Sequence, residues 1–403
     1  MSRQSEQQSR VIGVRGGPWR GRVDHLGTVR PDDGSTPWAW HVAGDDRWYS
    51  PADEPTLRQK WYSGFPVAET RMRVGGGDII QRVWCVADAG GITVMEFEND
   101  TPATVAIAMT RSDLLTTREI ADNPPQGIDL PAGSVVLPLA HRSTLRVGLS
   151  HVDPSRGRLP DDVPDHQQVV RGWETACDIA SRLTLPDHTV VATICRVRSD
   201  LLLSPGDAPL EAAAELVRLG ETHRDSILEV VDAAQARLKK EKRSKVLAWD
   251  TPHALAMAAR ACVLLDDDRA AGDIGVAWLR MADRPVHEPP VEMPAGLAAI
   301  AWAESILARP SASGGMCELM PWGIPQTWWG ANFEAHHLVG DPHRQVSYAV
   351  RWHGERPAVL WETTGAQGLV LTGGQADPQW STVEMSGEVL WRSPRGTSAT
   401  PAQ

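Results

Sequence analysis

The chain has 403 residues, a formal net charge of −11 at pH 7 and 42% apolar residues. This length allows two or three packed units, because single hydrophobic cores usually stop growing at about 250–300 residues. The acidic balance argues against nucleic acid as a partner, since phosphate binding relies on clustered lysine and arginine side chains. No apolar run approaches the roughly 18 residues of a membrane span, so we expect no membrane partner.

The N-terminal stretch lacks the apolar core of a secretory signal peptide, and the five cysteines are scattered without a Cys-x-x-Cys pair. This pattern is typical of reduced, buried thiols rather than of a disulfide framework or a zinc site. His336, His337 and His353 lie close in sequence, but no further ligand follows at a recognised metal spacing. We therefore expect a cytoplasmic protein with no metal and no cofactor.

The first half of the chain is predicted to be rich in β-strands. Several segments carry many β-branched residues, and turns that contain Pro and Gly separate them. The clearest of these expected strands cover residues 91–98, 104–109, 143–149 and 188–194. Many short strands at this spacing predict an antiparallel β-sandwich over residues 11–204, preceded by a disordered tail at residues 1–10.

The hydrophobic period changes to three-and-four spacing in the middle of the chain. Thr251 followed by Pro252 is typical of a helix start, and Pro310 ends the last helical pattern. The expected helices cover residues 210–238, 251–265, 274–281 and 297–307. Residues 205–310 are thus predicted to form a helical domain of four helices, or of five helices if Gly220 divides the first of them.

Strand patterns return after a segment rich in Gly and Ser at residues 311–315. The expected strands cover residues 346–352, 358–361, 368–372 and 388–391. They predict a small C-terminal β-domain over residues 316–392, followed by a disordered tail at residues 393–403. The whole chain is thus predicted to be an α+β multidomain protein with a β-sandwich, a short helical middle and a small β-domain.

The residue composition is unusual in its aromatic side chains, with 17 Trp against 3 Tyr and 3 Phe. Five of these tryptophans fall within residues 318–362, beside several glutamates and histidines. A flat indole can cover the apolar C–H face of a pyranose ring, while polar side chains bond the hydroxyl groups on its rim. This combination is typical of a surface that handles sugars.

Candidate site residues come from the same segment. Hydrolysis of a sugar bond generally needs two carboxyl groups, roughly 5 to 10 Å apart, one of them kept protonated by an apolar setting. Glu318 and Glu334 are the candidate catalytic acid and base, although Glu334 could instead pair with an arginine or the backbone to fix its loop. The candidate substrate-binding residues are Trp322, Trp328, Trp329, Asn332, His336, Arg351, Trp352 and His353. For Trp328 and Trp329, a sugar platform and a plug between domains both remain open.

Two pairs of segments, 329–336 with 347–362 and 66–78 with 91–100, resemble glycoside-hydrolase-like bacterial proteins. That broad class, which includes glucoamylase and glycogen-debranching relatives, is built on an (α/α)6 toroid with accompanying β-sandwich domains. The resemblance implies an N-terminal β-supersandwich, a helical middle and a C-terminal β-domain. A full toroid needs about twelve helices, and residues 205–310 have room for four or five. The helical domain therefore resembles a partial toroid, which leaves hydrolysis open.

Two functions follow from these observations. The first is a carbohydrate-active or carbohydrate-binding protein that acts on an α-glucan or a similar oligosaccharide. Whether it has glycoside hydrolase activity stays open. The second is a non-catalytic scaffold that retains glycosidase-type β-domains and uses its Trp-rich surface as a protein interface. In this second case a further copy of the chain would cover the exposed apolar face, giving a homo-oligomer.

Overall fold

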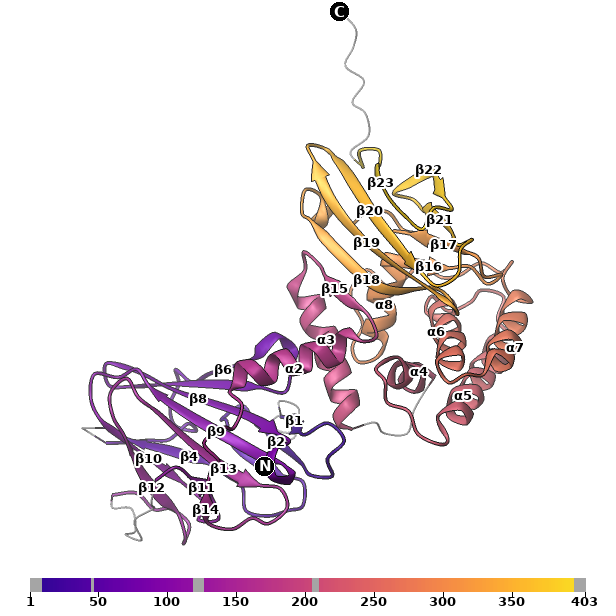
Figure 1. Cartoon of the computed structure of the whole chain (residues 1–403). Helices are drawn as coiled ribbons and strands as arrows, with labels where there is room; N and C mark the ends of the chain where they lie inside the picture. The colour runs from indigo at the N-terminus through magenta and orange to yellow at the C-terminus, as the bar shows by residue number, and fades with distance from the viewer. Residues whose placement is uncertain (1–8, 45–46, 119–126, 205–209, 395–403) are drawn as a thin grey trace, which may run out of the picture. The chain divides into compact units, whose positions relative to one another are not determined.

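The computed structural model describes residues 9–44, 47–118, 127–204 and 210–394 (Figure 1). It confirms the predicted mixed α+β class, with antiparallel sheets and seven α-helices in this part of the chain. The chain divides into two compact units, Met1–Glu174 with Leu202–Ser204, and Thr175–Leu201 with Pro205–Gln403. The tails predicted to be disordered lie almost wholly outside the described residues.

The first unit contains three sheets. The three-stranded sheet has the order β1-β2-β3, with β1 (Arg10–Gly13), β2 (Arg20–Val23) and β3 (Val29–Pro31). The four-stranded sheet has the order β12-β10-β4-β5, with β4 (Trp40–Ala43), β5 (Trp48–Tyr49), β10 (Val105–Met109) and β12 (Val135–Leu139). The seven-stranded sheet has the order β14-β11-β13-β9-β8-β7-β6, with β6 (Arg58–Trp61), β7 (Ala68–Val74), β8 (Gly77–Val86), β9 (Ile92–Asn99), β11 (Leu115–Thr116), β13 (Thr144–Ser150) and β14 (Gly157–Arg158).

These strands form because alternate apolar residues face one shared core. In β12, for example, Val135, Leu137 and Leu139 are buried, and the residues between them face outward. Trp40 and Phe97 pack in the same core with ring centroids 5.5 Å apart. The predicted strands at residues 91–98, 104–109 and 143–149 are confirmed as β9, β10 and β13.

A row of alternating charges crosses the seven-stranded sheet. In register from β6 to β13 the row reads Lys60, Glu69, Arg82, Glu96 and Arg146. Each neighbouring pair forms an ion pair, with N to O distances of 2.6 to 3.1 Å. Opposite charges on adjacent strands stabilise this register, because a slip of one residue would move every member of the row to the other face of the sheet.

Residues 188–194 form the first part of a helix, so the strand predicted there is wrong. Helix α3 (His188–Leu203) begins after Asp187, whose Oδ1 accepts the backbone N–H of Thr189 at 2.9 Å. Val190, Ile194 and Val197 are buried at helical spacing. The capping side chain and this apolar stripe outweigh the β-propensity of the branched residues.

The helices within residues 210–307 agree well with the sequence, but the helix at residues 166–178 was not predicted, because residues 11–204 were expected to form a β-sandwich. Helix α2 (His166–Asp178) precedes α3, and the helical segment contains α4 (Leu210–Arg218), α5 (Ser226–Glu241), α6 (Thr251–Leu264), α7 (Asp268–Leu279) and α8 (Ala298–Leu307). Five helices therefore occupy the described part of residues 205–310, as expected. Gly220, with a φ of +83°, lies just beyond the end of α4, where a left-handed residue terminates a helix.

The second unit also carries two sheets. The five-stranded sheet has the order β15-β18-β19-β20-β23, with β15 (Arg182–Thr184), β18 (Phe333–Asp341), β19 (Arg344–His353), β20 (Arg356–Thr364) and β23 (Ser386–Leu390). The four-stranded sheet has the order β16-β17-β21-β22, with β16 (Ala308–Pro310), β17 (Met316–Leu319), β21 (Val370–Gly373) and β22 (Asp377–Thr382). Leu319 and Leu371 of the smaller sheet share one core with Phe333 and Tyr348 of the larger sheet. None of the helices in the described ranges is long and apolar enough to cross a membrane.

Candidate functional site

Two neighbouring strands, β18 and β19, carry half of the predicted site residues. Phe333 and Ala335 of β18 are buried in the core, so the alternation of a strand turns Glu334 toward the other face. On β19, Val350 is buried and Arg351 faces the same way as Glu334. We call the residues Asn332, Glu334, His336 and Arg351 the β18–β19 face. Trp352, the next residue after Arg351, alternates to the other side of β19 and packs against the core.

Glu334 is held between two basic side chains. Its Oε2 lies 2.9 Å from His336 Nε2, and its Oε1 accepts a hydrogen bond from the Arg351 guanidinium. Hydrogen bonds from His336 and then Arg351 lower the pKa of Glu334 below its usual value, against the opposing effect of burial. The carboxylate is therefore ionised and acts as an acceptor, which is unlike the protonated carboxyl group that a general acid requires.

Glu318 lies on a different sheet. It is on β17 between the buried residues Cys317 and Leu319, and its carboxylate pairs with Arg309 Nε at 2.7 Å. The Arg309 guanidinium in turn lies 5.2 Å above the ring of the predicted platform Trp322. Because Glu318 and Glu334 both point away from the core that their two sheets share, the structure does not bring these two carboxylates together.

The predicted tryptophan platforms differ in exposure. Trp328 is 4% exposed and packs edge-on against Phe333, with ring centroids 5.2 Å apart, so it is a core residue. Trp329 and Trp352 are half-buried. Their indole N–H groups bond the backbone oxygens of Ile324 and Ala331 at 3.0 and 2.8 Å. These bonds fix the orientation of both rings.

Asn332, which precedes β18, bonds the backbone of β19. Its Oδ1 accepts the backbone N–H of Trp352 at 3.1 Å, and its side chain is otherwise exposed. His353, the last residue of β19, is exposed.

A β-bulge in β18 follows Ala335, where His337 has a φ of +60°. The sequence did not predict this bulge, which places His336 and His337 opposite a single partner position on β19.

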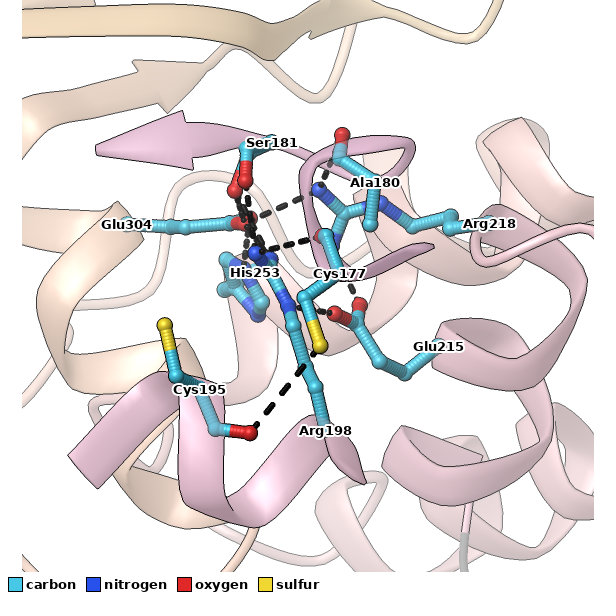
Figure 2. Close-up of polar contacts among 9 residues, drawn as sticks. All are labelled: Cys177, Ala180, Ser181, Cys195, Arg198, Glu215, Arg218, His253 and Glu304. Carbon is cyan, nitrogen blue, oxygen red and sulfur yellow. Dashed lines mark hydrogen bonds and ion pairs between the residues drawn. The ribbon is translucent and has the colours of Figure 1, made fainter. Parts of the chain in front are cut away.

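A buried ionic cluster was also missed by the sequence analysis (Figure 2). It joins Arg198 of α3, Glu215 and Arg218 of α4, His253 of α6 and Glu304 of α8, and each of these residues is at most 8% exposed. Glu304 Oε1 accepts bonds from Arg198 at 3.1 Å and Arg218 at 2.9 Å, and its Oε2 lies 3.0 Å from His253 Nε2. The Arg198 guanidinium also reaches Glu215 at 2.7 Å.

The members of the ionic cluster keep each other charged. Burial alone would raise the pKa of Glu304, but Arg218, His253 and Arg198 hold it well below its usual value. Burial likewise opposes the charge of Arg218, while Glu215 and Glu304 raise its pKa. Desolvated opposite charges interact strongly, so the cluster fixes the helices that carry it. One sequence signal could have revealed it, namely a charged residue such as Glu304 within an apolar helix.

Two further features bear on possible sites. Across the described ranges, no group of three or more His, Cys, Asp or Glu side chains is arranged to hold a metal ion. The first unit has an open hollow of about 540 Å³, which contains none of the predicted site residues. Its lining residues are His25, Leu26, Pro51, Ala52, Glu54, Leu57 and Gln59.

Comparison with known proteins does not identify a family for this chain. No protein-family model matches the chain, and no curated protein matches it.

Proposed function

We propose that the protein binds a carbohydrate, an α-glucan or a similar oligosaccharide, on the β18–β19 face. The N-terminal supersandwich and the partial toroid implied by the resemblance to glycoside-hydrolase-like proteins belong to the same proposal. The single observation that carries it is the fixed group of Glu334, His336 and Arg351 on one strand face, next to Asn332.

This arrangement suits the rim of a sugar. A carboxylate accepts hydrogen bonds from hydroxyl groups, and a guanidinium and an amide donate to them. Because Glu334 and Arg351 already hold each other in place, little side-chain entropy is lost when a ligand binds. The indole N–H of Trp352 is satisfied within the protein. Its ring packs against the core on the side of β19 opposite Arg351, so the proposed contacts to the sugar come from the polar side chains.

The proposed activity is binding rather than hydrolysis by the Glu318 and Glu334 pair. Hydrolysis would require the two carboxyl groups to flank one bond, roughly 5 to 10 Å apart, and one of them to be protonated. The two project from different sheets, and the pKa of Glu334 is lowered by His336 and Arg351.

Isothermal titration calorimetry with maltooligosaccharides and a glycan array tests this proposal. We expect binding by the wild-type protein, and an affinity at least tenfold lower for Arg351→Ala, because the loss of a charged hydrogen bond costs about 1.5–3 kcal/mol. Glu334→Gln and Glu318→Gln form a matched pair, since each removes one charge from an arginine-paired glutamate. Only Glu334→Gln should weaken binding. No binding at millimolar ligand, or equal losses for both variants, would refute the proposal.

A protein interface is a second candidate, supported by a different observation. Leu360 of β20 and Leu390 of β23 are 40% and 42% exposed, and the register places them diagonally across adjacent strands. Exposed apolar neighbours of this kind are typical of a surface that another subunit covers. Light scattering should then detect a dimer that Leu390→Glu converts to monomer, whereas a monomer at all concentrations would contradict this function.

A further inference from the structure

A small cavity lies between three helices of the second unit, next to the ionic cluster. It has about 10 Å³ of space for the centre of a water-sized occupant. This is roughly the room that one water molecule needs. The cavity is lined by Glu211 and Glu215 of α4, by His253, Ala254 and Met257 of α6, and by Leu297, Ile300 and Ala301 at the start of α8.

One polar atom of a residue that lines this cavity has no partner. His253 is 8% exposed, and its Nε2 lies 3.0 Å from Glu304 Oε2. An ionised carboxylate only accepts hydrogen bonds, so Nε2 carries the hydrogen that it shares with Glu304, and Nδ1 is the ring nitrogen left without a partner. Nδ1 is buried and has no hydrogen-bond partner in the described part of the chain. A buried polar atom in this state costs about 1–3 kcal/mol.

The chemistry of the lining restricts what could satisfy Nδ1. The polar side chains at the cavity are His253, Glu211 and Glu215, and the carboxylates can only accept. An occupant must therefore donate hydrogen bonds to more than one acceptor. Glu211 is paired with Arg237 at 3.1 Å, and Glu215 is paired with Arg198 and Arg218 at 2.7 and 2.6 Å. Because these carboxylates are already neutralised, a neutral donor fits better than a cation.

We propose that this cavity is a binding site for a single ordered water molecule, which forms one hydrogen bond with His253 Nδ1 and donates another to a carboxylate of α4. The water completes the polar network between α4, α6 and α8, since His253 joins it directly to Glu304. It is a structural ligand of the helical segment and is independent of the saccharide proposal.

A crystal structure of the full chain, grown without ammonium salts, tests this directly. We expect an electron-density peak about 2.7–3.2 Å from His253 Nδ1. An empty cavity at a resolution that shows other buried waters would overturn the proposal. So would a peak that appears only when ammonium is added, because the occupant would then be a cation.

Filling the cavity provides an independent test in solution. Ala301→Val adds two methyl groups at the lining, and we expect it to expel the water and to raise the unfolding equilibrium constant at least tenfold. The control is Ala236→Val on the exposed side of α5, which carries the same change in helix propensity. If the cavity is instead empty, Ala301→Val should stabilise the protein relative to this control, which would overturn the proposal.

A second variant keeps the test decisive should Ala301→Val not fold. Ala301→Ser offers a hydroxyl in place of the water, and it should lose the density peak without losing stability. A peak that persists at full occupancy in the Ala301→Ser variant would overturn the displacement argument.

Discussion

At the scale of single residues, the strongest effects come from buried charges that lose a partner. Glu304 is 2% exposed and neutralises two arginines at once. We expect Glu304→Gln to lower the free energy of unfolding by about 3–5 kcal/mol, because it leaves Arg198 and Arg218 in a dry site with too little negative charge. Urea denaturation measures this loss. Glu318→Gln, which breaks a half-exposed pair, is the control and should cost less than about 1 kcal/mol. Equal effects of the two variants would contradict this account.

The pKa of Glu69 makes the stability of the first unit depend on acid pH. Burial raises the pKa of this carboxyl, but hydrogen bonds from Tyr62, Arg71, Lys60 and Arg82 outweigh burial and lower it from 4.5 to about 2. A carboxyl with a lowered folded-state pKa stabilises the protein above its unfolded value, and this contribution disappears as the pH falls from about 4.5 to about 2.

Glu69→Gln should therefore destabilise the protein most at pH 6–7, and the difference from wild type should shrink steadily below pH 4.5. Urea titrations at a series of pH values measure the difference. A constant difference between pH 7 and pH 3 would show that the charge of Glu69 is not what stabilises the row across the sheet. Glu98→Gln, which changes a more exposed member of the same network, is the control and should cost less stability at pH 7.

At the scale of elements, the sequence predicted most helices and strands because hydrophobic period and turn residues are local signals. It failed at residues 188–194, where Asp187 caps a helix that the branched residues alone do not indicate. It also failed to separate Glu318 from Glu334. Their closeness in sequence gives no information about which sheet each strand joins, and this is decided by long-range pairing of β17 with β21 and of β18 with β19. The ionic cluster was missed for the same reason, since its members come from four helices.

The hairpin between β7 and β8 has two glycines with different physical roles. Gly75 has a φ of +53°, as expected for a tight turn. Gly77 lies against the backbone, where an added Cβ would be 2.1 Å from the oxygen of Asp100. We expect Gly77→Ala to cost about 1–3 kcal/mol, because the backbone must move.

Gly76→Ala is the matched control for that substitution. An added Cβ at Gly76 would meet only the ring of Pro102 at 3.3 Å. It should change the free energy of unfolding by less than about 0.5 kcal/mol, as surface substitutions usually do. Thermal denaturation of both variants measures the change in the free energy of unfolding. A larger loss of stability for Gly76→Ala than for Gly77→Ala would contradict the contact geometry.

At the scale of the whole molecule, the two units have separate hydrophobic cores. The first is built around Trp40 and Phe97, and the second around Tyr348 and the helices α4 to α8. The residues of the two units belong to separate clusters, so the effects of substitutions in them should add and remain local.

Hydrogen exchange measured by mass spectrometry tests this separation. Gly77→Ala should increase exchange in β7 to β9 and leave α6 and α8 unchanged, and Glu304→Gln should do the opposite. The double variant should show the sum of both changes. Faster exchange throughout the chain in either single variant would mean that the two units unfold as one cooperative body.

The ionic cluster also has a consequence for the order in which the chain acquires its structure. Glu304 follows Ser181, another of its partners, by 123 positions, and it follows Arg198 by 106. During synthesis, Arg198 and Arg218 leave the ribosome well before the carboxylate that neutralises both. Contacts this distant in sequence form late and slowly, so a nascent chain that ends before α8 should hold these arginines in water and keep its helices loosely packed.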